Sequence, residues 1–471
     1  MDVLTVKHCL FQIERAKMMR MKALLLAGVF TGAFCAGAET RICTNLFLKA
    51  RTDRENPVGY RVGETIAFDF TLEGSDPIDP DEVFTVSVSC MPEGQPTLHD
   101  KRTITKRKGF RFETKMERPG FVRIVAAFND GAGRELRRDP KTPEARKHGS
   151  DLAFNGSAAA EPEKLKPFES EPSDFDAFWA AAKRELKELP MNPIVEEVPD
   201  VADKTTRCFR VKLDCLGPRP ATGFLTVPRR CFDDSSYRVP VRLKFDGAGL
   251  RPPQCRECGV GNEIRFHVNA HGFDLGRDQK YYEDFFAENL GYRGKLPAYT
   301  AFYVYDEKAN AEPRTSYMFG MVMRVLRALE YAKSLNEWNG KDIIVSGGSQ
   351  GGLQTMWAAG LGDGITHAEP WITWSCDLGG FKDKRWSSSW RIPYAKGIFY
   401  YDPVFMARRI PATCSLDITR VGLGDSAAPP TGIFITYNEC RAPKRMRLVQ
   451  GNGHDDCIPP QPNQEYVLEE K

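Results

Sequence analysis

Two hydrophobic patterns divide the chain near residue 150. Before this point, short runs of alternating apolar and polar residues are separated by Gly, Pro and Asp; the clearest are Thr65–Leu72, Phe84–Ser89 and Phe121–Phe128. Alternation with a period of two is typical of strands that bury one face, and a series of such short strands is typical of an antiparallel sandwich. We therefore predict that residues 39–150 form an immunoglobulin-like β-sandwich. For this domain a packing or spacer role is favoured over carbohydrate binding, because β-sandwich domains occur in proteins with many unrelated functions.

The pattern changes after this region. Residues 151–172 are rich in Ala, Glu, Pro and Ser, which predicts a linker. Ser173 is the expected N-cap of an amphipathic helix that runs to about Leu189. Strand-like and helix-like segments then alternate, which predicts an α/β domain over residues 173–471 with a mostly parallel sheet and helices on both faces. Its clearest segments are the strands Val239–Phe245, Ile264–Ala270, Ile372–Cys376 and Asp417–Leu423 and the helix Tyr317–Leu335.

The first 38 residues have the pattern of a leader. Basic residues precede the apolar run Ala23–Ala38, which ends in Ala36-Gly37-Ala38. This pattern predicts a signal peptide that is cleaved after Ala38, and hence a secreted or periplasmic protein. The run is short for a bilayer span, so a membrane anchor is the weaker alternative. Lipidation at Cys35 is a minor alternative, and the true translation start stays open because several methionines precede the run.

Composition narrows the function classes. A chain of 471 residues is long enough for two domains, and its balance of 41% apolar and 27% charged residues is that of a soluble globular protein. The 66 basic and 63 acidic residues are interspersed, so nothing favours nucleic-acid binding. Setting aside two of the 13 cysteines in the leader leaves an odd number, whose connectivity stays open. Cys255 and Cys258 form a Cys-x-x-Cys pair without a second such pair, which favours a structural role or disulfides over a zinc or redox centre.

The strongest chemical signal lies within Asp342–Ala359. An apolar run meets a glycine cluster and a helix-forming segment, and Gly347, Ser349 and Gly351 form Gly-x-Ser-x-Gly at the junction. A serine at the tip of a sharp strand-to-helix turn projects its hydroxyl, and flanking glycines let neighbouring backbone approach closely. We predict that Ser349 is a nucleophile; the alternative is a glycine-rich turn without chemistry.

A serine nucleophile needs a base and a carboxylate that orients the base. On this type of turn the chain order is nucleophile, acid, base. Asp425 follows one predicted strand and His454 follows the next, and His454 is the histidine near the C-terminal end that lies beyond a plausible acid. We predict Asp425 and His454 as the partners of Ser349. The competing acids are Asp377, Asp402, Asp417, Asp455 and Asp456.

These motifs, taken together, resemble the acetyl xylan esterase and cephalosporin-C deacetylase family of α/β-hydrolases. The resemblance extends from about Asp174 to His454, and it rests on Gly347–Gly352, Tyr400–Asp402, Ala407–Ile410, Gly422–Asp425, Pro429-Pro430, Tyr437-Asn438 and Gly453-His454. It implies Ser349 as nucleophile, His454 as base and Asp425 as the partner of the base. It also implies removal of acetyl groups from sugar hydroxyls, without a metal or a cofactor.

An oxyanion hole is expected from the backbone N–H groups of Gln350 and Ala248. Here the chain departs from the family, which has His-Gly-Tyr where this sequence has Asp246-Gly247-Ala248. A tyrosine there would form a wall of the acyl pocket, so alanine leaves room for a larger acyl or sugar group. A second departure is His271-Gly272-Phe273, where the family pattern is Arg-Gly-Gln, and it concerns the residues around the site.

We therefore predict a secreted serine carbohydrate esterase that acts on acetylated xylan, xylo-oligosaccharides or related sugar esters through an acyl-enzyme. An esterase for a bulkier acyl or glucuronoyl ester is one alternative. A prolyl-type peptidase is another, although such enzymes usually carry a β-propeller, for which residues 39–150 are too few. A non-catalytic binder is a third. The sequence leaves the oligomeric state open, because an extra N-terminal domain could block the rings that members of the family form.

Overall fold

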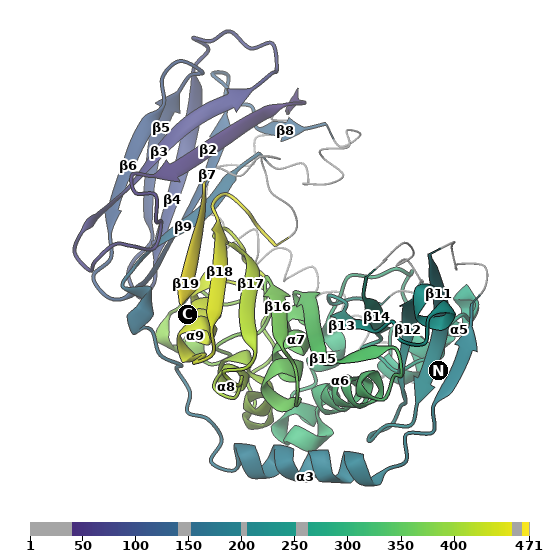
Figure 1. The fold of residues 1–471 in the computed structure, drawn as a ribbon. Helices are drawn as coiled ribbons and strands as arrows, with labels where there is room; N and C mark the ends of the chain where they lie inside the picture. Colours follow the sequence, from purple (N-terminus) through teal and green to yellow (C-terminus); the bar gives the residue numbers. More distant parts are fainter. Residues whose placement is uncertain (1–39, 140–151, 199–204, 251–261, 455–463, 471) are drawn as a thin grey trace, which may run out of the picture.

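The computed structural model describes residues 40–139, 152–198, 205–250, 262–454 and 464–470. Figure 1 shows a smaller β domain, residues 40–160, against one end of a larger sheet domain, residues 162–470. The predicted leader and the Cys255/Cys258 pair lie outside the described residues. Within the described ranges, no helix has both the length and the apolar composition that a bilayer crossing requires.

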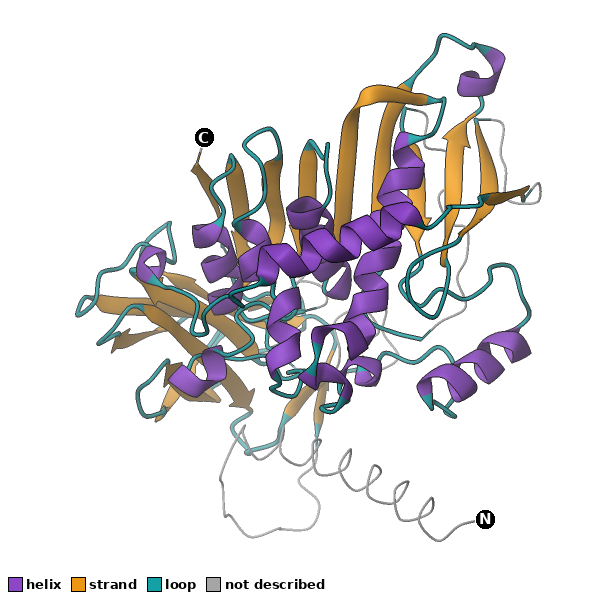
Figure 2. Ribbon diagram, turned by 90° about the horizontal axis from the view of Figure 1, so that it is seen from below, coloured by secondary structure: helices purple, strands orange, loops and turns teal. Residues whose placement is uncertain are grey.

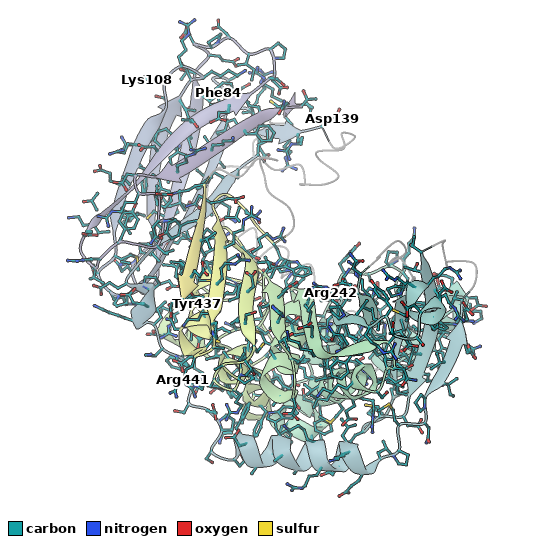
Figure 3. All side chains as sticks on the ribbon, viewed as in Figure 1. Phe84, Lys108, Asp139, Arg242, Tyr437 and Arg441 are labelled. Carbon is teal, nitrogen blue, oxygen red and sulfur yellow. The ribbon has the colours of Figure 1, made fainter. Side chains whose placement is uncertain are left out.

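The β domain is built from short antiparallel strands with alternating buried and exposed side chains. One sheet has the order β2 (Leu46–Thr52), β3 (Thr65–Gly74), β6 (Phe110–Lys115), and the other β5 (Leu98–Ile104), β4 (Phe84–Pro92), β7 (Gly120–Asn129), β9 (Phe154–Ala160). A parallel pair, β1 (Arg41–Cys43) and β8 (Leu136–Arg138), lies apart from them. Both sheets contribute to one apolar core that contains Phe84, whereas Lys108 lies on an outer loop (Figure 3). The immunoglobulin-like arrangement itself stays a prediction.

Strand β9 corrects the predicted linker. It lies inside residues 151–172 and pairs with β7 from Gly120↔Ala160 to Ala126↔Phe154. Its sequence is rich in Gly, Ser and Ala, which are weak strand formers, so the local pattern did not predict a strand. These small residues are almost all buried, because the strand is covered on both sides. The β domain therefore extends to Ala160 rather than ending at residue 150.

The sheet domain is organised around one mixed sheet. Its central strands from β14 to β18 are parallel, and its outer strands are antiparallel. In spatial order the strands are β10 (Ile194–Glu197), β11 (Thr206–Leu213), β12 (Ala221–Pro228), β14 (Ile264–Val268), β13 (Val239–Phe245), β15 (Trp338–Gly348), β16 (His367–Trp371), β17 (Ser415–Gly422), β18 (Lys444–Val449) and β19 (Glu465–Glu470).

Two local predictions differ from the structure. The strand expected over Ile372–Cys376 is instead β16, which ends at Trp371, because Ile372 and Ser375 have positive φ angles that a strand does not allow. The first helix of the domain, α3 (Phe175–Glu188), has Asp174 rather than Ser173 at its N-cap position. The strands β13, β14 and β17 and the long helix α6 (Tyr317–Lys333) lie where the sequence predicts them.

Helices cover the sheet on the side seen in Figure 2. Helices α6, α7 (Gln350–Leu361), α8 (Pro403–Ala407) and α9 (Pro430–Glu439) contact one another in that order. Helix α3 crosses outside them, and α5 (Gln279–Leu290) lies at the β11 end of the sheet (Figure 1). The α6–α9 layer accounts for one of the two helical faces that the sequence predicts.

The two domains share apolar packing. Val58, Phe121 and Ala159 of the β domain belong to the core of the sheet domain rather than to that of their own. The Phe121 ring meets the Phe434 ring of α9 edge to face, with 5.2 Å between centroids. Burial of such a large ring between domains couples their stabilities.

We expect Phe121→Ala to reduce the free energy of unfolding of the sheet domain by about 3–5 kcal/mol, because it removes a fully buried ring at the interface. Tryptophan fluorescence during urea unfolding measures this directly, since all seven tryptophans lie in the sheet domain. Leu98→Ala, at an exposed position of β5, is the control and should change stability by less than about 0.5 kcal/mol. An unchanged fluorescence transition in Phe121→Ala would mean that the domains unfold independently.

Candidate active site

Ser349 occupies the sharp turn between β15 and α7. Its backbone angles are φ 57° and ψ −118°, a strained conformation for a residue with a side chain. The positions around it must be glycine, because a Cβ atom there would lie too close to neighbouring atoms. A Cβ atom on Gly351 would lie 2.2 Å from the carbonyl oxygen of Phe245, and one on Gly348 would lie 2.1 Å from Nε1 of Trp371. The close packing of strand, turn and helix therefore holds the hydroxyl of Ser349 out of the turn.

The structure joins Ser349, His454 and Asp425 in one chain of hydrogen bonds. Nε2 of His454 lies 2.8 Å from Oγ of Ser349, and Nδ1 lies 2.9 Å from Oδ2 and 3.1 Å from Oδ1 of Asp425. The three residues follow the carboxyl ends of β15, β17 and β18, which lie in the parallel part of the sheet. Parallel strands end at the same edge, so residues far apart in sequence meet there.

Asp425 is fully buried and is held by more than the histidine. Its Oδ1 accepts hydrogen bonds from the backbone N–H groups of Ala427 and Ala428, each at 2.8 Å. These donors fix the carboxylate in one orientation toward Nδ1 of His454. With its proton on Nδ1, the imidazole presents Nε2 as an acceptor to the hydroxyl of Ser349.

The competing acids that the structure describes have other partners. Asp377 pairs with Arg385 at 2.7 Å, and Asp417 pairs with Arg445. Asp402 caps helix α8 through the N–H of Val404, and its burial raises its pKa to about 7. The remaining two competitors, Asp455 and Asp456, lie outside the described residues.

The two segments that carry the predicted oxyanion donors lie beside the serine. Gln350 is the first residue of α7, so its backbone N–H is one of the donors that a helix leaves without an internal acceptor. A Cβ atom on Gly247 would lie 3.8 Å from Cβ of Ser349, so the loop with Ala248 passes next to the hydroxyl. The placement of Gln350 and of the Ala248 loop is compatible with an oxyanion hole. That these residues act as one stays a prediction.

His271, which the sequence marks as a departure from the family pattern, supports this loop. Its Nε2 donates to the carbonyl oxygen of Gly249 at 3.0 Å, and its Nδ1 accepts from the hydroxyl of Tyr317 at 2.9 Å. Burial lowers the pKa of His271 to about 3, so the ring is neutral near pH 7. Tyr303 packs edge to face on the same ring, and its hydroxyl donates to Oε1 of Gln350 at 2.5 Å.

Trp390 is a residue near the site for which the sequence carried no signal. Its ring meets the ring of His454 with 5.8 Å between centroids, and 38% of the residue is exposed. The Trp374 indole and the Tyr305 hydroxyl both donate to the carbonyl oxygen of Trp390, which fixes the backbone there. Tyr303 also carried no signal, because it lies in a short 3₁₀ turn, Phe302–Val304, without a motif.

The described residues contain no group of three or more His, Cys, Asp or Glu side chains arranged to hold a metal ion. Cys208 is disulfide-bonded. The free cysteines among the described residues are Cys43, Cys90, Cys215, Cys231, Cys376, Cys414 and Cys440, nearly all of them buried. None of these residues forms part of the Ser349, His454 and Asp425 arrangement.

Comparison with known proteins finds similar esterases. Residues 160–382 match the family model for acetyl xylan esterase. The acetyl esterase Axe7A of Xylanibacter ruminicola is 29% identical over 310 residues, which cover 62% of this chain. The chain spans 66% of the length of that relative.

Two solved structures share the fold. The acetyl xylan esterase from Paenibacillus sp. R4 is 23% identical, with a TM-score of 0.50, and the match covers 63% of this chain and 94% of that one. Acetyl xylan esterase 1 from Thermoanaerobacterium sp. JW/SL YS485 is 16% identical, with a TM-score of 0.50, over 63% of this chain and 92% of that one. The sheet domain therefore has a fold of the α/β-hydrolase type.

We expect His271 to make stability depend on pH. The folded state keeps this ring neutral down to about pH 3, whereas the unfolded chain takes up a proton near pH 6.5, so acid favours unfolding. The stability advantage of wild type over His271→Leu should therefore shrink by about 2 kcal/mol between pH 7 and pH 5, as measured by urea denaturation at each pH.

The matched control is Phe286→Leu, which alters a buried ring that packs on His271 but removes no titrating group. Its stability difference from wild type should be the same at both pH values. A pH-independent difference for His271→Leu would contradict the assignment of a neutral buried ring.

Proposed function

We propose that this chain is a serine esterase of the acetyl xylan esterase family that removes acetyl groups from acetylated xylan, xylo-oligosaccharides or related sugar esters, because residues 160–382 match the model of that family. The observation that carries the proposal is the hydrogen-bonded chain from Ser349 through His454 to Asp425. It lies at the sheet edge where this fold places its chemistry.

The first half-reaction follows from the geometry. Oγ of Ser349 attacks the ester carbonyl carbon while Nε2 of His454, at 2.8 Å, takes the hydroxyl proton. The carboxylate of Asp425 stabilises the imidazolium that forms. The oxygen of the tetrahedral intermediate accepts hydrogen bonds from the backbone N–H groups of Gln350 and Ala248. The sugar hydroxyl leaves with the proton from His454, and the acetyl group stays on Ser349.

The second half-reaction repeats these roles with water. His454 takes a proton from a water molecule as its oxygen attacks the acetyl-enzyme, and the same N–H groups hold the oxyanion. Collapse of this intermediate returns the proton to Oγ of Ser349 and releases acetate. No residue needs to change its place between the two halves.

The surroundings of Ser349 support a sugar substrate with room on the acyl side. The half-exposed indole of Trp390 beside His454 offers a flat apolar surface of the kind on which the C–H faces of sugar rings pack. Ala248 contributes only a methyl group to the loop next to the serine. This small side chain favours, as a second candidate, an ester with a bulkier acyl or glucuronoyl group.

We also propose that the reaction takes place outside the cytoplasm. The support is the leader pattern of residues 1–38, with cleavage after Ala38. A polymeric substrate such as acetylated xylan is too large to enter a cell without prior cleavage, so an exported enzyme suits it.

Ser349→Ala should lower turnover on acetylated xylo-oligosaccharides on the order of several thousand-fold or more, because no other group replaces the nucleophile. Release of acetate, quantified across acetylated sugars, methyl glucuronate esters, chromogenic esters and peptides, measures this and ranks the candidate substrates. Ser334→Ala, at the C-terminal end of α6, is the control and should retain wild-type rates. Undiminished release by Ser349→Ala would exclude the mechanism, and cleavage of peptides in preference to esters would favour the peptidase alternative.

Trp390→Ala should lower kcat/KM for acetylated oligosaccharides about tenfold, which corresponds to the loss of one aromatic contact, while hydrolysis of a small chromogenic acetate changes little. Steady-state kinetics on both substrates gives the comparison. Phe232→Ala, at a similarly exposed aromatic on α4 (Arg230–Asp233), should leave both substrates unaffected. Equal losses on the two substrates would assign Trp390 to support of His454 rather than to the sugar.

A further inference from the structure

Strand β9 of the β domain contacts the loops that carry both Asp425 and His454. Nδ2 of Asn155 donates to the carbonyl oxygen of Gly424, which directly precedes Asp425, at 2.6 Å. Two residues further along, the backbone of Ser157 pairs with the side-chain amide of Gln450, with its N–H donating at 3.0 Å and its carbonyl accepting at 2.8 Å. Gln450 stands between β18 and His454. β9 is the outermost strand of its sheet, and alternate residues of an antiparallel strand direct their backbone N–H and C=O groups to the same edge, so the edge of β9 opposite β7 meets both loops.

The two domains approach each other closely at two glycines, Gly424 and Gly156. A Cβ atom on Gly424 would lie 2.0 Å from the carbonyl oxygen of Asn155. One on Gly156 would lie 2.2 Å from Oε1 of Gln450. A side chain at either position would displace these atoms, so β9 lies in direct contact with the loops that carry the acid and the base.

Arg123 on the neighbouring strand β7 completes the contact. Its Nε donates to Oδ1 of Asn155 at 3.0 Å, and its guanidinium carbon lies 4.6 Å from the ring centroid of Trp386. Within the described part of the chain, Arg123 forms no ion pair with a carboxylate. Burial lowers the pKa of Arg123 to about 10, and the negative charge of Asp425 acts in the opposite direction.

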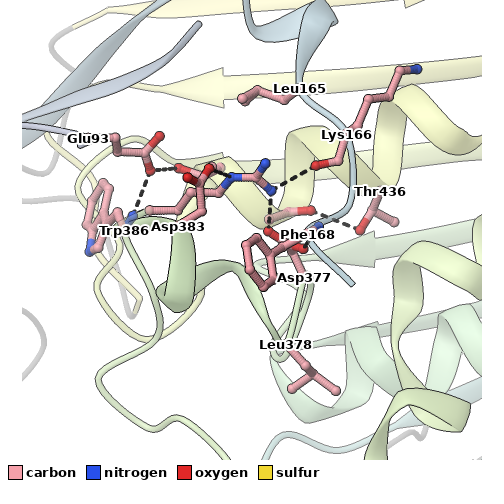
Figure 4. A network of polar contacts seen from close by, with 12 residues as sticks. Glu93, Leu165, Lys166, Phe168, Asp377, Leu378, Asp383, Trp386 and Thr436 are labelled. Carbon is pink, nitrogen blue, oxygen red and sulfur yellow. Dashed lines mark hydrogen bonds and ion pairs between the residues drawn. The ribbon is translucent and has the colours of Figure 1, made fainter. Parts of the chain in front are cut away.

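A second segment of the β domain fixes the loop that leads to Trp390. Glu93, which follows β4, accepts hydrogen bonds from the N–H of Trp386 at 2.7 Å and from the hydroxyl of Thr431 at 2.5 Å (Figure 4). The same loop is tied to the sheet domain by Arg385, which binds Asp377 and the carbonyl oxygen of Lys166 (Figure 4). The β domain therefore reaches three loops around the candidate site.

We propose that the β domain is part of the active-site architecture, with Arg123 and Asn155 as positioning residues for Asp425 and with Ser157 and Gln450 positioning the His454 loop. The inference rests on the proposed function, since it assigns roles toward the triad. This role differs from that of a spacer or a sugar-binding module, which would leave triad reactivity unchanged.

The test uses the full-length protein and a fluorophosphonate, which forms an Oγ–P bond with Ser349 and releases fluoride, so no carbohydrate is needed. Arg123→Met should lower the second-order inactivation rate on the order of tenfold, because Asn155 loses the donor that holds it. Arg123→Lys keeps a charged donor at this position, so it should retain more of the rate than Arg123→Met. Asn155→Ala should lower the rate by a similar factor, because the contact with the Asp425 loop is lost.

Arg111→Met is the matched control, since Arg111 is an exposed residue of β6 that pairs with Asp69 within the β domain. It should react at the wild-type rate. The inference is overturned if Arg123→Met and Asn155→Ala behave like wild type, or if Arg111→Met loses as much. Should Arg123→Met fail to fold, Asn155→Ala decides the matter by the same criteria. A wild-type protein that does not react at Ser349 would instead overturn the proposed function.

Discussion

The structure of the site depends on one buried carboxylate. Asp425 is fully enclosed, and a carboxylate removed from water without partners costs several kcal/mol. Its partners are two backbone N–H groups of its own loop and Nδ1 of His454. Each partner requires the loop after β17 to keep one conformation. The carboxylate thus turns a flexible strand-end loop into a rigid support for the imidazole.

The same demand for rigidity is met differently at Ser349. Its hydroxyl is presented by a strained backbone, and strain of this kind persists only where the surrounding packing leaves no alternative. Gly348 and Gly351 allow Trp371 and Phe245 to approach from two sides, and this packing leaves the turn no space for another backbone conformation. Below the turn, the neutral ring of His271 fixes the loop of Ala248 by its bond to Gly249. Packing, rather than a single bond, therefore determines where the serine and its neighbouring N–H groups lie.

How much of this could be predicted from sequence depends on the range of the interaction. The turn at Ser349 is encoded by adjacent residues, and Asp425 and His454 could be selected because they follow strands in a fixed order. The strands β13 and β17 carry their own apolar patterns and were predicted within a few residues. Trp390, Tyr303 and Arg123 could not be selected, because each gains its place through contacts with distant segments that leave no local pattern.

Strand β9 shows why its own sequence was misleading. Gly, Ser and Ala in succession are typical of a linker when only neighbouring residues are considered. In the structure Gly156 of β9 leaves room for the side chain of Gln450, and Gly424 lets its own loop approach the carbonyl oxygen of Asn155. A strand of alternating bulky residues would have been easier to predict, but it would have held the two domains too far apart for Asn155 to reach the Asp425 loop. The feature that hid the strand from sequence analysis is therefore the one that joins the β domain to the candidate active site.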